Sequence, residues 1–202
     1  MFPFFHMQAQ GLASGDVEKD AWPLRYFVDE GFELFCAQSF SVNFALYGER
    51  VGSLLVVLKS NEVLIHVRSQ LERLVRAKSL EPPAFGSRVV ATVLNNASHL
   101  TEWKESLKLA AQRLIITREK IKDQLRILGS LESWEHITQQ NDFFLYTGLT
   151  KAQVDFLAIE KHLHLRADGY MNISCLNTKN LNYVMHCIFQ TTSLITEGAN
   201  SI

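Results

Sequence analysis

The chain has 202 residues, of which 47% are apolar, and this content is sufficient for a packed core and excludes a disordered protein. Its 20 basic and 21 acidic residues give a formal net charge of -1, so neither nucleic acid nor an anionic membrane surface is expected as a partner. The longest apolar runs, such as Leu54–Leu58, are too short to cross a bilayer.

Two features predict a cytoplasmic location. The apolar stretch Met1–Phe5 has no basic region before it and no small-residue cleavage site after it, so a secretory signal is not expected. The cysteines are widely spaced and lack metal-ligand spacing: Cys36, Cys175 and Cys187. Such a set is typical of buried thiols in a reducing compartment.

The first part of the chain alternates between strand and helix patterns. Residues 2–5 are predicted to form a short strand that leads into a Gly/Ser turn at residues 11–15. Residues 20–30 carry aromatic side chains near helical spacing, and residues 32–37 and 51–58 have the composition of strands. This alternation is typical of an α/β layer.

From Glu62 onward the apolar spacing becomes helical. The apolar residues that recur at intervals of three and four are Leu64, Val67, Leu71 and Leu74. They form the stripe of an amphipathic helix. Pro82 and Pro83 are predicted to end this helix and to open the next one.

A long helix is predicted between Leu100 and Leu128, ending at Gly129. It would extend about 40 Å at about 1.5 Å per residue, which is long enough to connect two lobes. Its apolar face is predicted to contain Trp103, Leu107, Leu114, Ile121, Leu125 and Leu128. The basic residues expected off that face include Lys104, Lys108, Arg118, Lys122 and Arg126.

The remainder of the chain is predicted to form a compact α/β lobe. A strand over residues 143–147 precedes a helix over residues 151–161, which Thr150 opens. A short strand over residues 171–174 and a last helix from about residue 178 to residue 192 complete the lobe. The sequence contains no internal repeat and no low-complexity stretch.

Eight short segments, spread over nearly the whole chain, are similar to segments of one enzyme family in the same order and spacing. They are Phe2-Pro3-Phe4-Phe5, Gln10-Gly11, Asp20-Ala21-Trp22, Glu30-Gly31-Phe32-Glu33, Gly48-Glu49-Arg50-Val51-Gly52, Pro82-Pro83, Thr147-Gly148-Leu149 and Thr178-Lys179-Asn180-Leu181. The chain resembles the class I pyridoxal-phosphate-dependent aminotransferases, of the cytosolic aspartate aminotransferase type. It resembles only the C-terminal half of that family, so a short isoform or a fragment is expected.

The resemblance implies an α/β fold, namely the C-terminal half of the aminotransferase class I fold. Residues 1–108 would form the C-terminal portion of the large cofactor domain, and residues 109–202 would form the small C-terminal domain. The implied family reaction is pyridoxal-phosphate-dependent amino transfer between L-aspartate and 2-oxoglutarate. The implied partners are a second copy in a homodimer or a full-length family member, with an amino acid or a dicarboxylate as ligand.

The segment from Ser39 to Gly52 resembles the family's cofactor-lysine segment, in which a lysine between the serine and the asparagine holds pyridoxal phosphate as a Schiff base. Val42 stands in place of that lysine. Valine can neither condense with an aldehyde nor shuttle a proton, and a transaminase needs one amine for both tasks. We therefore predict a catalytically degenerate protein with no catalytic residue and no covalently bound cofactor.

Three positions keep residues that the resemblance connects with binding. Ser39 and Arg50 match the serine and the arginine that contact the cofactor phosphate, and a planar guanidinium suits a phosphate bidentately. Arg76 matches the arginine that binds the distal carboxylate of the substrate across the dimer. The alternatives are a turn serine, a surface arginine, and, for Arg76, a basic residue favoured at a helix C-terminus.

Three other positions depart from the family. His6 replaces the aspartate that pairs with the cofactor's pyridinium nitrogen, and Ala9 replaces the tyrosine that hydrogen-bonds the ring oxygen. Tyr170 replaces the arginine that binds the substrate α-carboxylate, and a phenol cannot form that bidentate ion pair. Together with Val42, these changes remove four different contacts.

Other chemistries find no support in the sequence. His162 and His164 lie two residues apart, but no Cys or carboxylate pair completes a ligand set, so no metal is predicted. A nucleophile elbow and a Gly-rich phosphate loop are also missing from the sequence. Two alternatives to a degenerate enzyme stay open: an active pyridoxal-phosphate enzyme with altered chemistry, and a non-catalytic dimerisation or binding protein.

Overall fold

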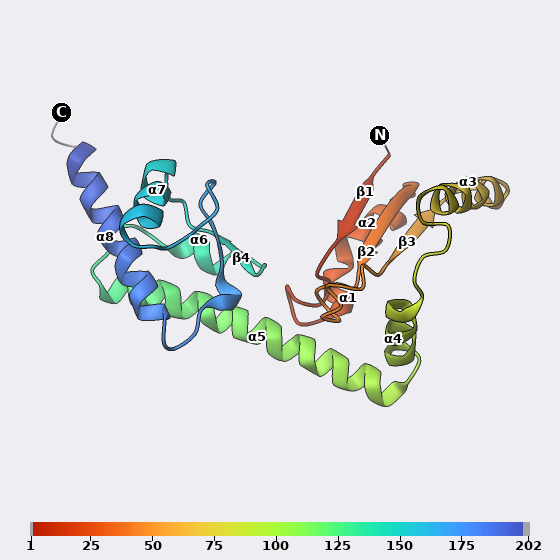
Figure 1. Ribbon diagram of the computed structural model, residues 1–202, viewed down its shortest axis with the longest axis horizontal. Coiled ribbons are helices and arrows are strands. Elements are labelled where there is room, and N and C mark those ends of the chain that lie inside the picture. Colours follow the sequence, from red (N-terminus) through yellow and green to blue (C-terminus); the bar gives the residue numbers. More distant parts are fainter. Residues whose placement is uncertain (1, 200–202) are drawn as a thin grey trace. The chain divides into compact units, whose positions relative to one another are not determined.

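The computed structural model describes residues 2–199, which alternate between helices and strands (Figure 1). The chain divides into two compact units, Met1–Leu109 and Ala110–Ile202. Both units combine helices with a small sheet, so the predicted α/β class is confirmed. Within residues 2–199, the helices are all too short or too polar to span a membrane.

The first unit contains a three-stranded sheet in the order β1-β2-β3. Strand β1 (Phe4–Met7) runs parallel to β2 (Leu34–Ser39), and β3 (Gly52–Val57) runs antiparallel to β2. All three strands were predicted, but β1 and β2 each begin two residues later than expected. Pro3 has no N–H to donate, and the Phe32 N–H is used by Phe27 at the end of a helix.

One face of this sheet is packed and the other is open. Helices α1 (Val17–Asp20) and α2 (Trp22–Asp29) lie between β1 and β2 in the chain. Leu34 and Cys36 are fully buried, and Phe5, which points to the same face, contacts the ring of Phe27 at 5.2 Å between centroids. The paired residues His6 and Ala37 point to the opposite, more exposed face.

Two helices follow the sheet in the chain. Helix α3 (Asn61–Ser79) begins after Ser60, whose hydroxyl accepts a hydrogen bond from the Glu62 N–H, as an N-cap residue does. The Leu80 N–H donates to the Arg76 carbonyl at the end of this helix. Helix α4 (Phe85–Leu94) follows Pro82 and Pro83, as the sequence predicts.

Helix α5 (Ala97–Ile127) is the predicted long helix and belongs partly to each unit. It ends at Ile127, two residues before the predicted Gly129, which has a φ of 86° that glycine adopts without strain. The expectation that Arg118 lies off the apolar face is wrong, because only 3% of this residue is exposed. Arg118 lies four residues after Leu114 and three before Ile121, so helical spacing places all three on one side.

The second unit encloses its own core. Strands β4 (Phe144–Tyr146) and β5 (Tyr170–Asn172) pair in an antiparallel manner. Around them are α6 (Glu135–Thr138), α7 (Lys151–Glu160), the 3-10 helix η1 (Ile173–Cys175) and α8 (Leu181–Ala199). The buried cluster comprises Leu114, Ile121, Leu125, Trp134, Ile137, Leu145, Leu149, Val154, Leu157, Met171, Ile173, Leu176, Val184, Met185, Cys187 and Ile188.

Local polar contacts explain where the helices of this unit begin. Thr150 opens α7 in a capping box with Gln153, as predicted. Helix α8 starts three residues later than predicted, because the Asn180 side chain accepts from the Asn177 N–H and holds a turn there. The short elements α6 and η1 were not predicted, since one turn of helix carries no readable periodicity.

The three cysteines differ in exposure, which corrects the expectation of buried thiols. Cys36 and Cys187 are buried, but Cys175 is exposed. Burial raises the pKa of the Cys36 thiol above its ordinary value, so little reactive thiolate forms there at neutral pH.

We predict that a thiol-alkylating reagent modifies Cys175 first in the folded chain. Cys36 and Cys187 should react at least about tenfold more slowly, because both residues are buried. Peptide mass mapping after timed alkylation at pH 7 measures the three rates. In denaturant the three cysteines should be alkylated at equal rates. Equal alkylation rates in the native chain as well would contradict this assignment of burial.

Candidate functional site

One edge of the three-stranded sheet gathers five of the predicted site positions. The parallel pairing puts the carboxyl ends of β1 and β2 at the same edge, and the antiparallel pairing brings the start of β3 there, with Ser39 opposite Gly52. His6 and Ala9 belong to the end of β1 and the residues after it, Ser39 and Val42 to the end of β2 and the turn after it, and Arg50 to the segment before β3. We name this group of five the sheet-edge site.

The loop between β2 and β3 is closed at its base by backbone contacts. The Phe40 N–H donates to the Val51 carbonyl at 3.0 Å, next to Ser39 on one side and Arg50 on the other. The Ser39 hydroxyl oxygen accepts from the Ser41 N–H at 3.2 Å, so its own O–H is still available to donate. Ser39 and Arg50 are therefore held on adjoining stretches of chain.

Val42 lies inside a tight turn that is tied to the loop after β1. The Ala45 N–H donates to the Val42 carbonyl at 3.1 Å, and the Asn43 side-chain amide donates to the Gln10 carbonyl at 3.2 Å. Gln10 directly follows Ala9, so this second bond connects the Ala9 loop with the Val42 turn. The Val42 side chain is half-buried.

Helix α5 holds the same turn from another side. The Trp103 indole N–H donates to the Asn43 carbonyl at 2.8 Å, and its ring stacks on Phe44 at 4.6 Å between centroids. The Asn43 side-chain oxygen is buried and accepts no hydrogen bond within residues 2–199. A buried acceptor without a donor is uncommon, and it lies one residue from Val42.

Asp20 orders the loop after β1, a role that the sequence analysis did not assign. Its carboxylate accepts from the N–H groups of Gly11 at 2.7 Å and of Ala13 and Ser14 at 3.2 Å each. Gly11 has a φ of 91°, and a Cβ at that position would lie 2.7 Å from the Leu107 side chain. The Gly/Ser composition predicted the turn, but only the fold shows that the Asp20 carboxylate lies at its centre.

Arg50 and His6 are both exposed at the sheet-edge site. Arg50 has a φ of 51°, a left-handed conformation that is uncommon for a residue with a side chain and worth a functional explanation. Neither residue forms an ion pair within residues 2–199. The Arg50 guanidinium is thus free to bind an anion.

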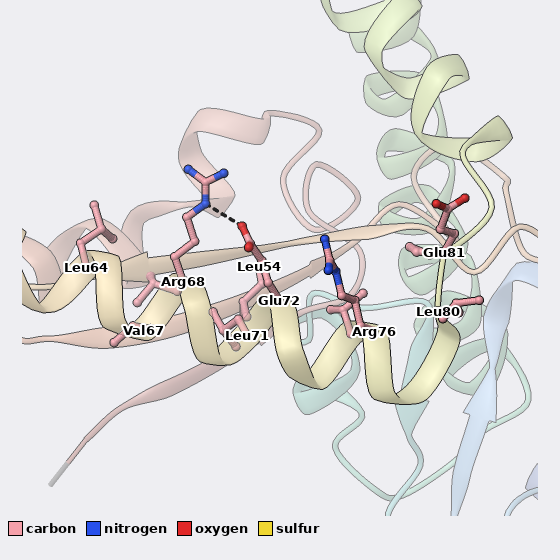
Figure 2. Close-up of a pocket in the computed structure, with 12 residues that line it drawn as sticks. Leu54, Leu64, Val67, Arg68, Leu71, Glu72, Arg76, Leu80 and Glu81 are labelled. Carbon is pink, nitrogen blue, oxygen red and sulfur yellow. Dashed lines mark hydrogen bonds and ion pairs between the residues drawn. The ribbon is translucent and has the colours of Figure 1, made fainter.

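Two predicted site residues lie away from this edge. Arg76 is in the last turn of α3 and lines a groove with Leu54 of β3, on the open face of the sheet (Figure 2). Tyr170 belongs to the second unit, where its ring lies 5.1 Å from that of Tyr146 and 5.6 Å from the Arg166 guanidinium.

Arg166 is a second residue that the sequence analysis did not single out. Its guanidinium forms a bidentate contact with Asp168, with N–O distances of 3.2 and 2.7 Å. The positive charge that stacks on Tyr170 is therefore already neutralised by an acid two residues away. Arg166 does not simply restore the charge that Tyr170 lacks.

Comparison with known proteins identifies the family. Residues 2–188 match the sequence profile "Aminotransferase class I and II". The chain is 47% identical to the cytoplasmic aspartate aminotransferase of Gallus gallus over 195 residues, which are 96% of this chain and 47% of that protein. The chain belongs to the class I and II aminotransferase family, and it spans about half the length of the curated relatives that it matches.

Solved structures of the family share this fold. A mitochondrial aspartate aminotransferase from Trypanosoma brucei superposes with a TM-score of 0.91 at 37% identity, over 95% of this chain and 50% of that one. An aromatic-amino-acid aminotransferase from Burkholderia pseudomallei, described as covalently bound to pyridoxal phosphate, superposes with a TM-score of 0.90 at 33% identity, over 94% of this chain and 47% of that one. The prediction that this chain has the fold of the family's C-terminal half is thus confirmed.

We predict that Trp103→Phe loosens the Val42 turn. Phenylalanine keeps the stacking on Phe44 but loses the hydrogen bond to Asn43, which is worth about 1 kcal/mol, so exchange of the Ala45 amide should accelerate about fivefold. Hydrogen exchange measured residue by residue provides the rates. Trp22→Phe is the matched control, because Trp22 is 66% exposed. An equal effect from both changes would show that the Trp103 hydrogen bond does not hold the Val42 turn.

Proposed function

We propose that this chain is an aspartate-aminotransferase-like protein that has lost the covalent step of the family reaction. The observation that carries the proposal is the position of Val42, in the turn that closes the sheet-edge site, where a Schiff base would need an amine. The valine side chain has no lone pair, so it can neither attack an aldehyde nor move a proton.

The phosphate end of pyridoxal phosphate fits the residues that remain. Ser39 offers an O–H that is free to donate, and Arg50 offers an unpaired guanidinium two residues before β3. Both groups lie at the same edge of the sheet, and a guanidinium and a hydroxyl together suit a phosphate. We propose that any binding of the cofactor is non-covalent and depends on these two residues.

The ring and aldehyde ends of the cofactor do not fit. His6 cannot supply the fixed negative charge that a pyridinium nitrogen needs, and Ala9 has no hydrogen-bonding side chain. On the substrate side, Tyr170 has a phenol where the family has a guanidinium, and its ring stacks against Arg166. Arg76 is therefore the residue that we propose for a substrate carboxylate.

Lys59 and Lys78 are not placed to supply an alternative amine at the site. Lys59 follows the end of β3, at the opposite edge of the sheet, roughly 20 Å away at about 3.3 Å per residue. Lys78 is in the last turn of α3. Within residues 2–199, no lysine donates a hydrogen bond to the segment from Ser39 to Arg50. An active enzyme with altered chemistry is therefore the less favoured proposal.

The remaining proposals follow the relatives. We propose that residues 1–108 correspond to the C-terminal portion of the large cofactor domain and residues 109–202 to the small domain. The name of the Gallus gallus relative supports a cytoplasmic location. We further propose that the chain dimerises, with itself or with a full-length family member, and that an amino acid or a dicarboxylate is its ligand. Its function would then be non-catalytic binding.

We predict that no lysine becomes covalently labelled by pyridoxal phosphate. The chain is incubated with the cofactor, reduced with borohydride and mapped by peptide mass spectrometry. The Ser39–Arg50 peptide should carry no pyridoxyl group, because it contains no lysine, and no other peptide should be labelled at stoichiometric yield. The Gallus gallus enzyme treated in parallel is the positive control. One fully labelled lysine would overturn the proposal.

We predict that Val42→Lys alone does not restore amino transfer. The new amine could be labelled in the borohydride experiment, but His6, Ala9 and Tyr170 still lack the contacts to the ring and the substrate. Groups that act as one unit are strongly non-additive, so turnover of aspartate should stay at least about a thousandfold below the Gallus gallus enzyme. A coupled assay for oxaloacetate measures it, and turnover within tenfold of that enzyme would show that the other replacements are tolerated.

A further inference from the structure

Arg118 is a buried cation in the second unit, and it forms no hydrogen bond within residues 2–199. Only 3% of the residue is exposed. Its Nε and Nη2 atoms are buried, and neither has a hydrogen-bond partner. Buried charged groups are normally paired, because a guanidinium that leaves water without a partner loses its hydration and gains no contact in return. Arg118 therefore lacks an acceptor that its burial requires.

The two buried, unbonded nitrogen atoms share one edge of the guanidinium group. Nε and Nη2 each direct an N–H to the same side of this planar group. Such a pair of parallel donors matches two oxygen atoms of a carboxylate or of a phosphate. The third nitrogen, Nη1, also lacks a hydrogen bond but is not fully buried. The guanidinium thus reaches solvent at one end, from which an anion could approach the edge.

The nearby cations of α5 have partners, which Arg118 lacks. Lys122, four residues further along the helix and on the same side, pairs with Glu135 of α6 at 2.9 Å. Arg113, one turn earlier, donates to the carbonyl of Ser174 in η1 at 3.1 Å. Helix α5 is therefore fixed before and after Arg118, and the unbonded edge belongs to an anchored stretch of helix.

Asp142 acts on Arg118 through its charge but does not bond to it. Burial lowers the pKa of Arg118 below its ordinary value, and the Asp142 carboxylate partly offsets this effect. The ion pairs within residues 2–199 do not include either residue. Asp142 is exposed, and its Oδ1 accepts from the Phe143 N–H at 2.6 Å. Phe143 is fixed in turn, because its carbonyl accepts from the Ile173 N–H at 2.9 Å.

We propose that the Nε–Nη2 edge of Arg118 is a binding site for a small oxyanion, namely a carboxylate or a phosphate group. Asp142 lies close enough to oppose that anion by its charge and is held too far away to replace it. The site belongs to the second unit, whereas Ser39 and Arg50 belong to the first. It is therefore independent of the residues that are proposed for the cofactor phosphate.

Nuclear magnetic resonance of the arginine Nε–H groups tests this site in the 202-residue chain. The Arg118 signal is assigned by through-bond correlation. Sodium acetate and sodium phosphate are titrated separately in exchange for sodium chloride at constant ionic strength, so a response reports two adjoining oxygens and not charge alone. The Arg118 signal should move downfield and saturate with at least one of the two anions, with a dissociation constant on the order of 10 mM.

Asp142→Asn is the test variant, and Asp155→Asn is the matched control. Each removes one negative charge from an exposed residue of the second unit, so neither should unfold the chain. Asparagine at position 142 also keeps the oxygen that accepts from the Phe143 N–H. Asp142→Asn should tighten anion binding at least about fivefold, because the opposing charge is gone, while Asp155→Asn should change it less than about twofold.

The two titrations distinguish the source of the oxyanion, since a response to acetate alone identifies a carboxylate and a response to phosphate alone a phosphate group. Absence of a saturable Arg118 shift with both anions would overturn the proposal, as would equal effects of the two variants. An upfield shift of the Arg118 signal on Asp142→Asn, before any anion is added, would also overturn it, because Asp142 itself would then occupy the edge. None of these outcomes depends on the aldehyde chemistry at Val42.

Discussion

The backbone pairing of three strands is the constraint on which the candidate site depends. Because β1 and β2 are parallel and β3 is antiparallel to β2, two carboxyl ends and one amino end meet at a single sheet edge. A shift of one residue in the register would turn every side chain of the shifted strand to the other face. The buried pair Leu34 and Cys36 fixes the register of β2, and the bond from Asn43 to Gln10 then holds the two loops together.

Much of this arrangement could be predicted from the sequence. For each part that could not be predicted, there is a physical reason. Aliphatic spacing located α3 and α5, and Thr150 located the start of α7, because periodicity and caps are local signals. The burial of Arg118 was mispredicted, since its charge outweighed its position between two core residues. The roles of Asp20 and Trp103 at the site were missed, because each bonds to a residue that only the fold brings near.

The site residues differ in what their roles require of the structure. Ser39 and Arg50 need only remain on adjoining chain segments to bind a phosphate, and the bond between Phe40 and Val51 keeps them there. The family chemistry at position 42 needs an amine at one place, and a valine side chain has none. We therefore propose that the fold keeps the family's architecture and an anion site while the covalent chemistry is lost. Architecture and activity are separable properties of such a chain.

The most direct measurement compares the affinities of pyridoxal phosphate and pyridoxamine phosphate for the chain by calorimetry. The two compounds share the phosphate and the ring, but only the first has an aldehyde, so any excess affinity for it reports a Schiff base. If Val42 has removed that bond, the two dissociation constants should agree within about threefold, and Arg50→Ala should weaken both equally. An affinity for pyridoxal phosphate at least about a hundredfold higher would show that another amine forms the bond, and would contradict the account.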